Sequence, residues 1–509
     1  MENETIPANA LEEEKKSFRN LQTYFSQMYP AIFPDILAEK TVVILPSLTL
    51  DKELLSKLRG HIHYEERMLC LLLLLRMPRT RLIYLSSIPI DDEIISYYLH
   101  LLQGVTGRHA RQRLTLLSCH DASSKPLTQK ILERPRLIQR IKAAIADTKA
   151  AHITCFNVTA LERTLAVQLE IPIYGTDPDL LSLGTKSGSR KVFQRAGVLM
   201  PKGFEDLKNR EEVIEALATL KAQNPQLRKA VVKTNDGFGG EGNAVYQYPQ
   251  NLNLNNLKSE ISSSLHEHLN LVLKDITLPI FFKKFEEMGG IVEEFIEGEE
   301  KTSPSVQCKI DPGGKISVVS THDQLLDGHD AQVFLGAHFP ADEAYNIAIA
   351  RDAKAIAHIL AEEGALGRFS IDFVSTKNNN IWKNYCIEIN LRKGGTTHPF
   401  LIMQYLSNGM YDDEKGFYLT ASGARRYYFS TDNIVKEGYK GLTPQDLVDI
   451  VTCNGLLYDG AAQEGVMFHM VGALSQYGKL GVVCIGATRQ KAIDFFNNVI
   501  RALDKETGT

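Results

Sequence analysis

Residues 367–400 read GRFSIDFVSTKNNNIWKNYCIEINLRKGGTTHPF, and the other motifs of the chain are interpreted around them. The pattern is typical of two strands joined by a polar turn, because RFSIDFV and IWKNYCIEINL are rich in β-branched and aromatic residues. Asp372 lies in the first strand, whereas Glu388 and Asn390 lie two apart in the second and share one face. Paired strands would gather oxygen ligands suited to Mg²⁺. A plain polar sheet face is the alternative.

An anion-binding helix start is indicated upstream. SRKVFQRAGV is expected to form a helix that ends at Gly197, with Pro201 beyond it. Lys186 precedes this helix, and a cation beside backbone N–H groups suits an anionic ligand. Considered alone, Lys186 is more compatible with a solvated surface lysine.

A glycine-rich hairpin is expected in KAVVKTNDGFGGEGNAVYQY, where Lys233 ends the first strand. Gly237, Gly239 and Gly242 satisfy G-x-G-x-x-G, but NAVYQY continues as a strand where the dinucleotide fingerprint needs a helix. Glycines let backbone amides approach phosphates closely, so Gly237, Gly239 and Gly240 are candidates for a lid over a triphosphate. No Walker A motif and no kinase H-R-D or D-F-G motif is present.

Two further segments carry candidate polar groups. GIVEEFIEGEE begins at Gly290 and is expected to be an edge strand, whose backbone at Phe295 and Ile296 would meet an adenine while Glu300 meets ribose hydroxyls. A charged edge strand without a ligand is the alternative. The histidine–aspartate pairs at 322–323 and 329–330 are more compatible with substrate lining or loop polarity than with a metal, because no short ligand spacing accompanies them.

The remaining pattern predicts an α/β and α+β multidomain protein. Strand-like and helix-like segments alternate over the first third of the chain, including an expected long helix from Leu127 to about Asp147, which indicates a parallel α/β domain at 1–172. A Gly/Pro/Asp-rich segment at 171–180 marks the start of a second domain, 173–423. Residues 424–509 are expected to form a small α+β domain with a terminal amphipathic helix.

Composition limits the classes of partner. The 509 residues carry 44% hydrophobic and 23% charged residues and a formal net charge of −4, with basic residues scattered, so neither nucleic acid nor a membrane surface is indicated. The longest apolar run, MLCLLLLL, stops at Arg76 and predicts a buried helix. Seven cysteines without a C-x-x-C pair, and an acidic N-terminus, favour a reduced cytoplasmic protein.

Taken in order, these motifs resemble the ATP-grasp carboxylate–amine ligases. The shared features are Lys186 before a helix ending AGV-x-x-P, Lys233 with the glycine hairpin, EEFIEGEE, and D…E-x-N-x-R ending at Arg392. VVILPSL, GTKSGSR, EINLRKGGTTHPF and FHMVGALSQYGKLGVVCIG are especially similar to the pheganomycin-type peptide ligases. The resemblance covers nearly the whole chain after its N-terminal segment. Ser370 departs from it, because D-alanine ligases carry arginine two residues before the aspartate that Asp372 matches.

The resemblance implies an N-terminal pre-ATP-grasp domain, an ATP-grasp domain and a small C-terminal domain. It also implies ATP- and Mg²⁺-dependent joining of an amino acid or peptide carboxylate to an amine through an acyl phosphate, without a covalent enzyme nucleophile; a homo-oligomer is possible. The implied contacts are phosphates at Lys186 and Lys233, a lid at Gly237, Gly239 and Gly240, adenine at Glu293, Phe295 and Ile296, ribose at Glu300, Mg²⁺ at Asp372, Glu388 and Asn390, and acyl phosphate at Arg392.

Two other functions are compatible with parts of this pattern. A regulatory or scaffold protein would bind ATP without turnover, although pure binding does not require Asp372, Glu388, Asn390 and Arg392 together. A carboxylase acting on a carrier-bound cofactor would share E-x-N-x-R, but nothing else in the chain points to such a partner. The identities of the acid and the amine stay open.

Overall fold

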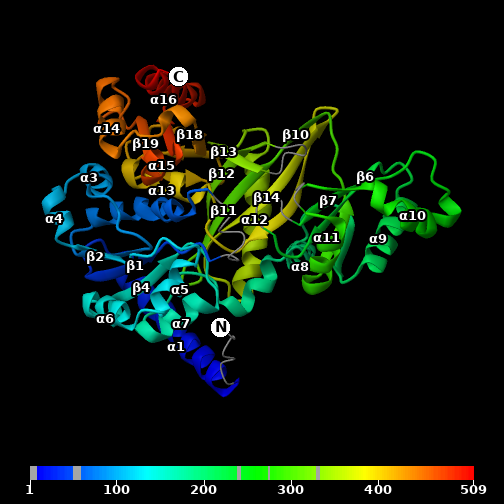
Figure 1. Ribbon diagram of the computed structural model, residues 1–509, viewed down its shortest axis with the longest axis horizontal. Coiled ribbons are helices and arrows are strands. Elements are labelled where there is room, and N and C mark those ends of the chain that lie inside the picture. The colour runs from blue at the N-terminus through cyan, green and yellow to red at the C-terminus, as the bar shows by residue number, and fades with distance from the viewer. Residues whose placement is uncertain (1–7, 50–58, 238–241, 273–275, 328–332, 509) are drawn as a thin grey trace.

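Three large sheets and one sheet of two strands are present in the computed structural model, which describes residues 8–49, 59–237, 242–272, 276–327 and 333–508 (Figure 1). The first sheet is parallel, with the order β3-β2-β1-β4, and confirms the expected N-terminal α/β architecture. Its strands are β1 (Lys40–Leu45), β2 (Thr80–Ser86), β3 (Leu114–Ser118) and β4 (Ala151–Cys155). The surrounding helices are α1 (Ala8–Ile32), η1 (His61–Arg76), α3 (Asp92–His100), α4 (Gly107–Arg111), α5 (Leu127–Leu132), α6 (Pro135–Ala144), η2 (Thr148–Ala150) and α7 (Ala160–Leu169).

Two expectations about these helices are resolved. The apolar run lies in η1 and is buried from Met68 to Leu73, as predicted, although the helix is of the 3₁₀ type. The single long helix expected from Leu127 is wrong, because the chain breaks between α5 and α6 at Arg134. Pro135 explains the break, since proline restricts the preceding residue to extended conformations, and Arg134 has φ −126° and ψ 79°. Among the described residues, no helix is long and apolar enough to span a membrane.

The second sheet is antiparallel, with the order β5-β9-β6-β7-β8, and forms the lobe on the right of Figure 1. The expected hairpin around the glycine-rich loop is confirmed, with Lys233 opposite Asn243. Gly242 has φ +85°, and a Cβ there would lie 2.0 Å from Thr234 Oγ1, so only glycine fits. The elements are β5 (Gly203–Leu207), β6 (Lys229–Thr234), β7 (Asn243–Gln247), β8 (Leu269–Leu271), β9 (Gly290–Glu294), α9 (Arg210–Gln223), η4 (Leu254–Asn256), α10 (Leu257–His268) and α11 (Leu278–Met288).

The third sheet has nine strands and carries the candidate site. Its order is β10-β14-β11-β12-β13-β18-β20-β19, with β15 paired to β14. The strands are β10 (Glu300–Thr302), β11 (Pro304–Ile310), β12 (Ile316–Asp327), β13 (Val333–Phe339), β14 (Gly367–Asn378), β15 (Ile381–Asn390), β18 (Tyr427–Val435), β19 (Gly465–His469) and β20 (Lys479–Gly486). The associated elements are η3 (Pro178–Gly184), α8 (Lys186–Ala196), α12 (Asn346–Glu362), α13 (Thr397–Ser407), β16 (Met410–Asp412), β17 (Phe417–Leu419), η5 (Glu437–Tyr439), α14 (Pro444–Cys453), η6 (Val471–Ala473), α15 (Leu474–Tyr477) and α16 (Arg489–Thr507).

The C-terminal strands are continuous with this third sheet. β13 pairs with β18, so the ordered backbone hydrogen bonds run on from the central strands into the C-terminal segment. One apolar core holds side chains of η1, the central strands and the C-terminal strands together, whereas the second sheet has its own core. The expected fold class is confirmed. The division into 1–172, 173–423 and 424–509 stays a prediction, and the third sheet contains strands from both sides of residue 423.

His322 lies inside β12 and is fully buried, so the expectation of loop polarity is wrong for this residue. Its Nε2 is 2.6 Å from the Tyr428 hydroxyl, and its ring packs near Phe339. Asp323 next to it accepts from the Tyr345 hydroxyl at 2.7 Å, which makes it a structural anchor. The second pair, His329 and Asp330, lies outside the described residues.

Replacing His322 with glutamine is predicted to make stability less dependent on acid pH. Burial lowers the pKa of His322 to about 3, whereas an unfolded chain protonates a histidine near pH 6.5. Between these values the unfolded state binds the additional proton, so stability falls as pH falls, by about 1.4 kcal/mol per pH unit. The free energy of unfolding is measured in urea from pH 7.5 to 5 for both proteins. Below about pH 6.5, the value for His322→Gln minus the value for wild type should increase by about 1.4 kcal/mol for each unit by which the pH falls. A difference that stays constant with pH would contradict this.

Candidate nucleotide and metal site

The predicted carboxylate pair is brought together by the β14–β15 register. Asp372 lies opposite Glu388, and Ser370 lies opposite Asn390. Asn390 Nδ2 donates to Asp372 Oδ2 at 2.9 Å, and Gln324 of β12 donates to Asp372 Oδ1 at 3.0 Å. The structure therefore gathers two carboxylates and two amides on one face of the sheet, of which Gln324 was not predicted from the sequence.

The electrostatics of this pair are asymmetric. Burial and, after it, the nearby charge of Glu388 raise the pKa of Asp372 to about 6. Burial alone would also raise the pKa of Glu388, but the ammonium of Lys186, 2.5 Å from its Oε1, outweighs this and lowers it. Two adjacent anionic side chains with limited solvent create a demand for positive charge at this point.

Lys186 is fixed by local structure at the start of α8. The Thr185 side chain accepts from the Gly188 N–H and caps the helix. The backbone N–H of Lys186 donates to the Asn235 carbonyl at 3.1 Å, which ties α8 to the loop after β6. Lys186 is only 6% exposed, so the alternative of a solvated surface lysine is wrong.

Lys233 belongs to a second buried ion-pair group. Its Nζ is 2.6 Å from Glu293 Oε1, and Arg190 of α8 contacts the other Glu293 oxygen at 3.3 Å. Arg190 also donates to Glu205 at 3.0 Å. Glu293 is thus held between two cations, which positions the Lys233 ammonium. The role of Arg190 gave no signal in the sequence, because only tertiary packing brings α8 against β9.

The segment predicted to meet a nucleoside runs from β9 to β10. The expectation of an edge strand is wrong for β9, which lies between β5 and β6 in the second sheet, whereas β10 is the first strand in the order of the third sheet. The N–H of Phe295 donates to the Lys229 carbonyl at 3.1 Å, so at Phe295 the carbonyl is the group left for an adenine edge. Glu300 begins β10 and accepts from Lys377 at 2.8 Å. Ile296 is partly exposed after the end of β9. Gly237 is described, but Gly239 and Gly240 lie outside the described residues.

Arg392 lies beside both carboxylates. Burial lowers its pKa, while the negative charges of Glu388, Asp372 and Asp236 raise it, and the cation of Arg67 lowers it. These influences place Arg392 in the field of the carboxylate pair and of a second arginine, contributed by η1. The chain turns sharply at Leu391, just before it, since the Arg392 N–H donates back to the Asn390 carbonyl at 2.7 Å. Arg67 was not predicted from the sequence.

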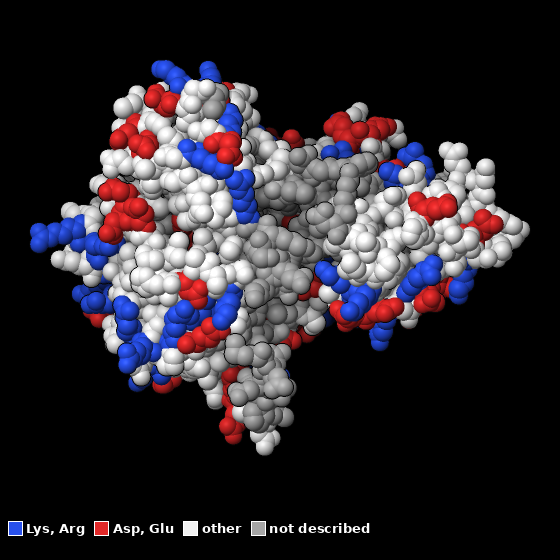
Figure 2. All heavy atoms as spheres, viewed as in Figure 1, with Lys and Arg blue, Asp and Glu red and all other residues white. Residues whose placement is uncertain are grey.

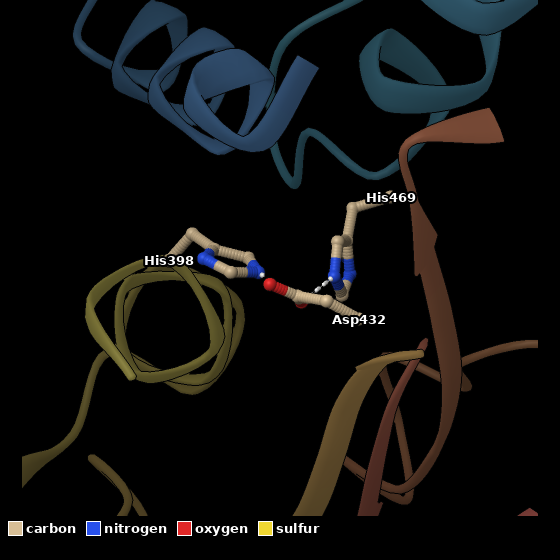
Figure 3. Close-up of side chains that lie close together, drawn as sticks. All are labelled: His398, Asp432 and His469. Atoms are coloured by element: carbon tan, nitrogen blue, oxygen red, sulfur yellow. Dashed lines mark hydrogen bonds and ion pairs between the residues drawn. The ribbon is translucent and has the colours of Figure 1, made fainter. Parts of the chain in front are cut away.

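Arg67 is anchored by a buried cluster of three side chains (Figure 3). Asp432 of β18 receives the Arg67 guanidinium at one oxygen, while its other oxygen is 2.6 Å from His469 Nε2 and 3.2 Å from His398 Nε2. His398 lies in α13, which directly follows the Arg392 turn, and His469 ends β19. The cluster therefore connects the C-terminal segment to the candidate site.

The contacts of this cluster favour a hydrogen-bonded network. His398, Asp432 and His469 together form a donor set known for divalent metals. However, 2.6 Å is a hydrogen-bond separation, and Arg67 already supplies the compensating charge. Burial would raise the pKa of Asp432, but Arg67 and then the two histidines hold it well below its usual range. We infer that the cluster positions Arg67 near Arg392.

Substituting Asp432 is predicted to destabilise the fold strongly. Asp432→Asn leaves the Arg67 guanidinium buried without a compensating charge, which typically costs about 3–5 kcal/mol. The control Asp413→Asn removes an exposed pair with Lys354, worth about 0–1 kcal/mol. Urea unfolding of both variants measures the difference, and Arg67→Met combined with Asp432→Asn should recover part of the loss. Equal, small effects at Asp432 and Asp413 would refute the anchoring role.

Charges on the outer surface show no comparable grouping in the described part of the visible face. Over those residues in Figure 2, Lys and Arg are interspersed with Asp and Glu. The concentration of charge described above is therefore a property of the interior, where β14, β15, α8 and β6 meet.

Comparisons with known proteins agree with this geometry. A family model described as IQCH-like, ATP-grasp matches residues 180–255 and 245–414, and one for the PGM1 C-terminal domain matches 446–494. The L-propargylglycine–L-glutamate ligase of Streptantibioticus cattleyicolor is 29% identical over 445 residues, which cover 86% of this chain and 88% of that ligase. IQ motif-containing protein H of Danio rerio is 25% identical over 386 residues, covering 67% of this chain and 36% of that protein.

Solved structures share the fold at low identity. Biotin carboxylase from Campylobacter jejuni has a TM-score of 0.53 and 16% identity, with 91% of each chain covered. An N5-carboxyaminoimidazole ribonucleotide synthetase in complex with ADP has a TM-score of 0.51 and 14% identity, with 93% of this chain and 99% of that chain covered. The family model gives similarity to ATP-grasp proteins over residues 180–414, and the match to the ligase extends over 86% of the chain, so the chain is similar to ATP-grasp ligases in both sequence and fold.

Proposed function

We propose that the chain is an ATP- and Mg²⁺-dependent ligase that joins a carboxylate to an amine through an acyl phosphate. The observation that carries this proposal is the placement of Asp372 opposite Glu388 with Lys186 at 2.5 Å and Arg392 in their field. A protein that only binds ATP has no need for an arginine beside its metal ligands. A ligase needs one, because negative charge develops on the transferred phosphoryl group and on the acyl oxygen.

Nucleotide contacts are assigned to the region where α8, β6 and β9 meet. Lys186 and Lys233 are the cations for the phosphates, and both are held by carboxylates that fix their ammonium groups. The glycine-rich loop that includes Gly237 closes over the triphosphate, adenine meets the backbone at Phe295 and Ile296, and ribose meets Glu300. Glu293 contributes by holding Lys233 and Arg190.

The donor set at the β14–β15 pair fits Mg²⁺. Asp372, Glu388 and Asn390 supply hard oxygen ligands, and one or two carboxylates with substrate phosphates form the usual environment of this ion. The pKa of Asp372, raised to about 6 by burial and by Glu388, shows that the pair lacks positive charge on the Asp372 side. When bound, the ion would neutralise phosphate charge and orient the terminal phosphoryl group.

The chemistry then follows from charge and positioning. The acid carboxylate attacks the γ-phosphorus, the bond from phosphorus to the bridging oxygen breaks, and ADP leaves. The amine, having lost a proton, attacks the acyl carbon, and phosphate leaves the tetrahedral intermediate. Arg392 stabilises the acyl phosphate and the developing oxyanion, with Arg67 as a second cation nearby.

The substrates are proposed from the relatives. The ligase from Streptantibioticus cattleyicolor has two amino acids in its name, so we assign an amino acid or peptide as the acid and another as the amine. The working compartment is proposed to be the cytoplasm, because all seven cysteines are free and six of them are buried. A homo-oligomer stays a prediction.

The direct test is ADP release across a panel of amino acids and dipeptides, with product masses determined. At least one acid–amine pair should yield stoichiometric ADP, phosphate and a product of condensed mass. Glu388→Gln should abolish ADP formation while the protein stays folded, because it removes a metal-ligand charge. Glu363→Gln, which removes an exposed partner of Arg195, is the matched control with full activity. ATP binding without turnover on the whole panel would favour the scaffold function, and near-normal turnover of Glu388→Gln would overturn the metal assignment.

Removing Lys233 is predicted to weaken ATP binding selectively. Lys233→Ala deletes a charge-assisted contact worth about 1.5–3 kcal/mol, which corresponds to roughly 10- to 100-fold in Kd. The fold should survive, because Arg190 still neutralises Glu293. Lys191→Ala is the control, since its exposed ammonium pairs with Asp206 at 2.6 Å and faces solvent. Calorimetric ATP titration measures both. Similar Kd values for the two variants would contradict the phosphate assignment.

A further inference from the structure

A pocket distinct from the nucleotide and metal site, here called the cationic pocket, lies between the first sheet, η1, α13 and the start of β14. Its volume is about 220 Å³. Four of its lining residues are cations from four separate segments, Lys40 of β1, Lys309 of β11, Arg368 of β14 and Lys393 after β15. Aromatic rings of Tyr29, Phe33 and Tyr405 form part of the wall, and none of the described residues that line the pocket is a carboxylate.

Two of these cations face each other across a strand pair. Lys309 lies directly opposite Arg368 in the antiparallel β11–β14 register. Like charges in this arrangement repel and destabilise a sheet. Burial lowers the pKa of the Lys309 ammonium, and the positive charge of Arg368 lowers it as well. Arg368 Nη1 is buried without a hydrogen-bond partner.

The described residues do not neutralise this charge. None of the four cations forms an ion pair in the described part of the chain. Asp35 acts on Lys40 and Asp311 acts on Lys309, both through space. Lys40 Nζ also donates to the Asp35 carbonyl at 2.6 Å, and Lys393 donates to Thr154 at 3.2 Å. These backbone and hydroxyl oxygens accept hydrogen bonds from the two ammonium groups, but they carry no full negative charge. An isolated buried charge is expensive, so an anion is the natural complement.

The pocket is separate from the nucleotide and metal site. Arg368 and Asp372 are four residues apart on β14 and share a face, which puts them about 13 Å apart at about 3.3 Å per residue. Between them the chain from Lys393 to Thr396 covers the sheet, where Thr396 Oγ1 accepts from Gln307 at 2.6 Å. Arg392 faces the metal ligands on one side of this segment, while Lys393 lines the pocket on the other.

We propose that the cationic pocket binds a small dicarboxylate of about four to five carbons. The space open to the centres of water-sized groups is about 220 Å³, and about 10–15 Å³ of such space holds one water, so the pocket exceeds the needs of a bare oxyanion and has room for a short carbon chain with two carboxylates. The Arg368 guanidinium matches one carboxylate in a two-point contact, with Lys309 beside it. Lys40 and Lys393, on other segments, meet the second carboxylate, and the aromatic wall packs against the chain between them.

The test uses glutarate as the probe, with the full-length protein and no nucleotide. Glutarate lacks an amine and therefore does not serve as an amine substrate. Millimolar glutarate should raise the melting temperature and give a saturable calorimetric isotherm, whereas butyrate, which keeps the chain and one carboxylate, and inorganic phosphate should bind at least tenfold more weakly. Arg368→Gln should fold, because it removes one half of a like-charge pair, and it should lose the glutarate shift.

Matched variants distinguish this pocket from other sites. Arg351→Gln, an exposed arginine whose side chain is 80% accessible, should keep the full shift. Arg392→Ala should also keep it, which separates the pocket from the substrate carboxylate site, and so makes the result independent of the proposed ligase function. No shift with glutarate, an equal shift with butyrate or phosphate, or a shift that persists in Arg368→Gln would each overturn the proposal.

Discussion

The contact between Lys186 and Glu388 is the constraint on which the candidate site depends. The β14–β15 register forces Asp372 and Glu388 together, and two carboxylates at one buried point repel each other. The Lys186 ammonium, 2.5 Å from Glu388, relieves half of that repulsion. It is available there because α8 begins at this position, capped by Thr185 and tied to the loop after β6. The same contact therefore joins the strand that carries Glu388, a proposed metal ligand, to the helix that carries Lys186, a proposed phosphate-binding cation.

Charge is balanced differently in three neighbouring parts of the interior. Lys233 and Arg190 both form ion pairs with Glu293, so these cations have a charge partner within the chain. Arg67 is balanced by Asp432, with His398 and His469 completing the hydrogen bonds around that carboxylate. The cationic pocket has no such partner, although it lies on the same face of β14 as Asp372. This contrast is the reason to seek an external anion there and a structural role for the other two groups.

Local periodicity was sufficient to predict part of this arrangement. Asp372, Glu388 and Asn390 were placed on paired strands because a strand alternates its faces every residue and a polar turn joins the two strands, although this turn is limited to 379–380 and the residues from 376 to 378 belong to β14. The glycine hairpin with Lys233 was readable for the same reason. The break before Pro135 was also readable from the proline, and the expectation of one long helix overlooked it.

The remaining features depend on contacts distant in sequence. Arg67, Asp432 and His469 come from η1, β18 and β19, and no spacing rule relates positions so far apart. Gln324 reaches Asp372 from a strand two places along the sheet order, and the continuity of β13 with β18 places the C-terminal strands in the central sheet. His322 was expected in a loop because polar residues surround it in the sequence, but the segment forms β12 and the His322 side chain is buried. Tertiary packing determines whether such a segment becomes a buried strand, and no local pattern in a single sequence records that packing.

The most direct measurement of the central claim is the fate of oxygen during turnover. The acid substrate that turns over is labelled with ¹⁸O in both carboxylate oxygens, and the released phosphate, the nucleotide and the amide product are analysed by mass spectrometry. Attack of the carboxylate on the γ-phosphorus predicts one ¹⁸O in inorganic phosphate, one retained in the amide, and unlabelled ADP. Label recovered in AMP, or phosphate that carries none, would contradict an acyl phosphate and with it the roles assigned to the carboxylate pair and Arg392.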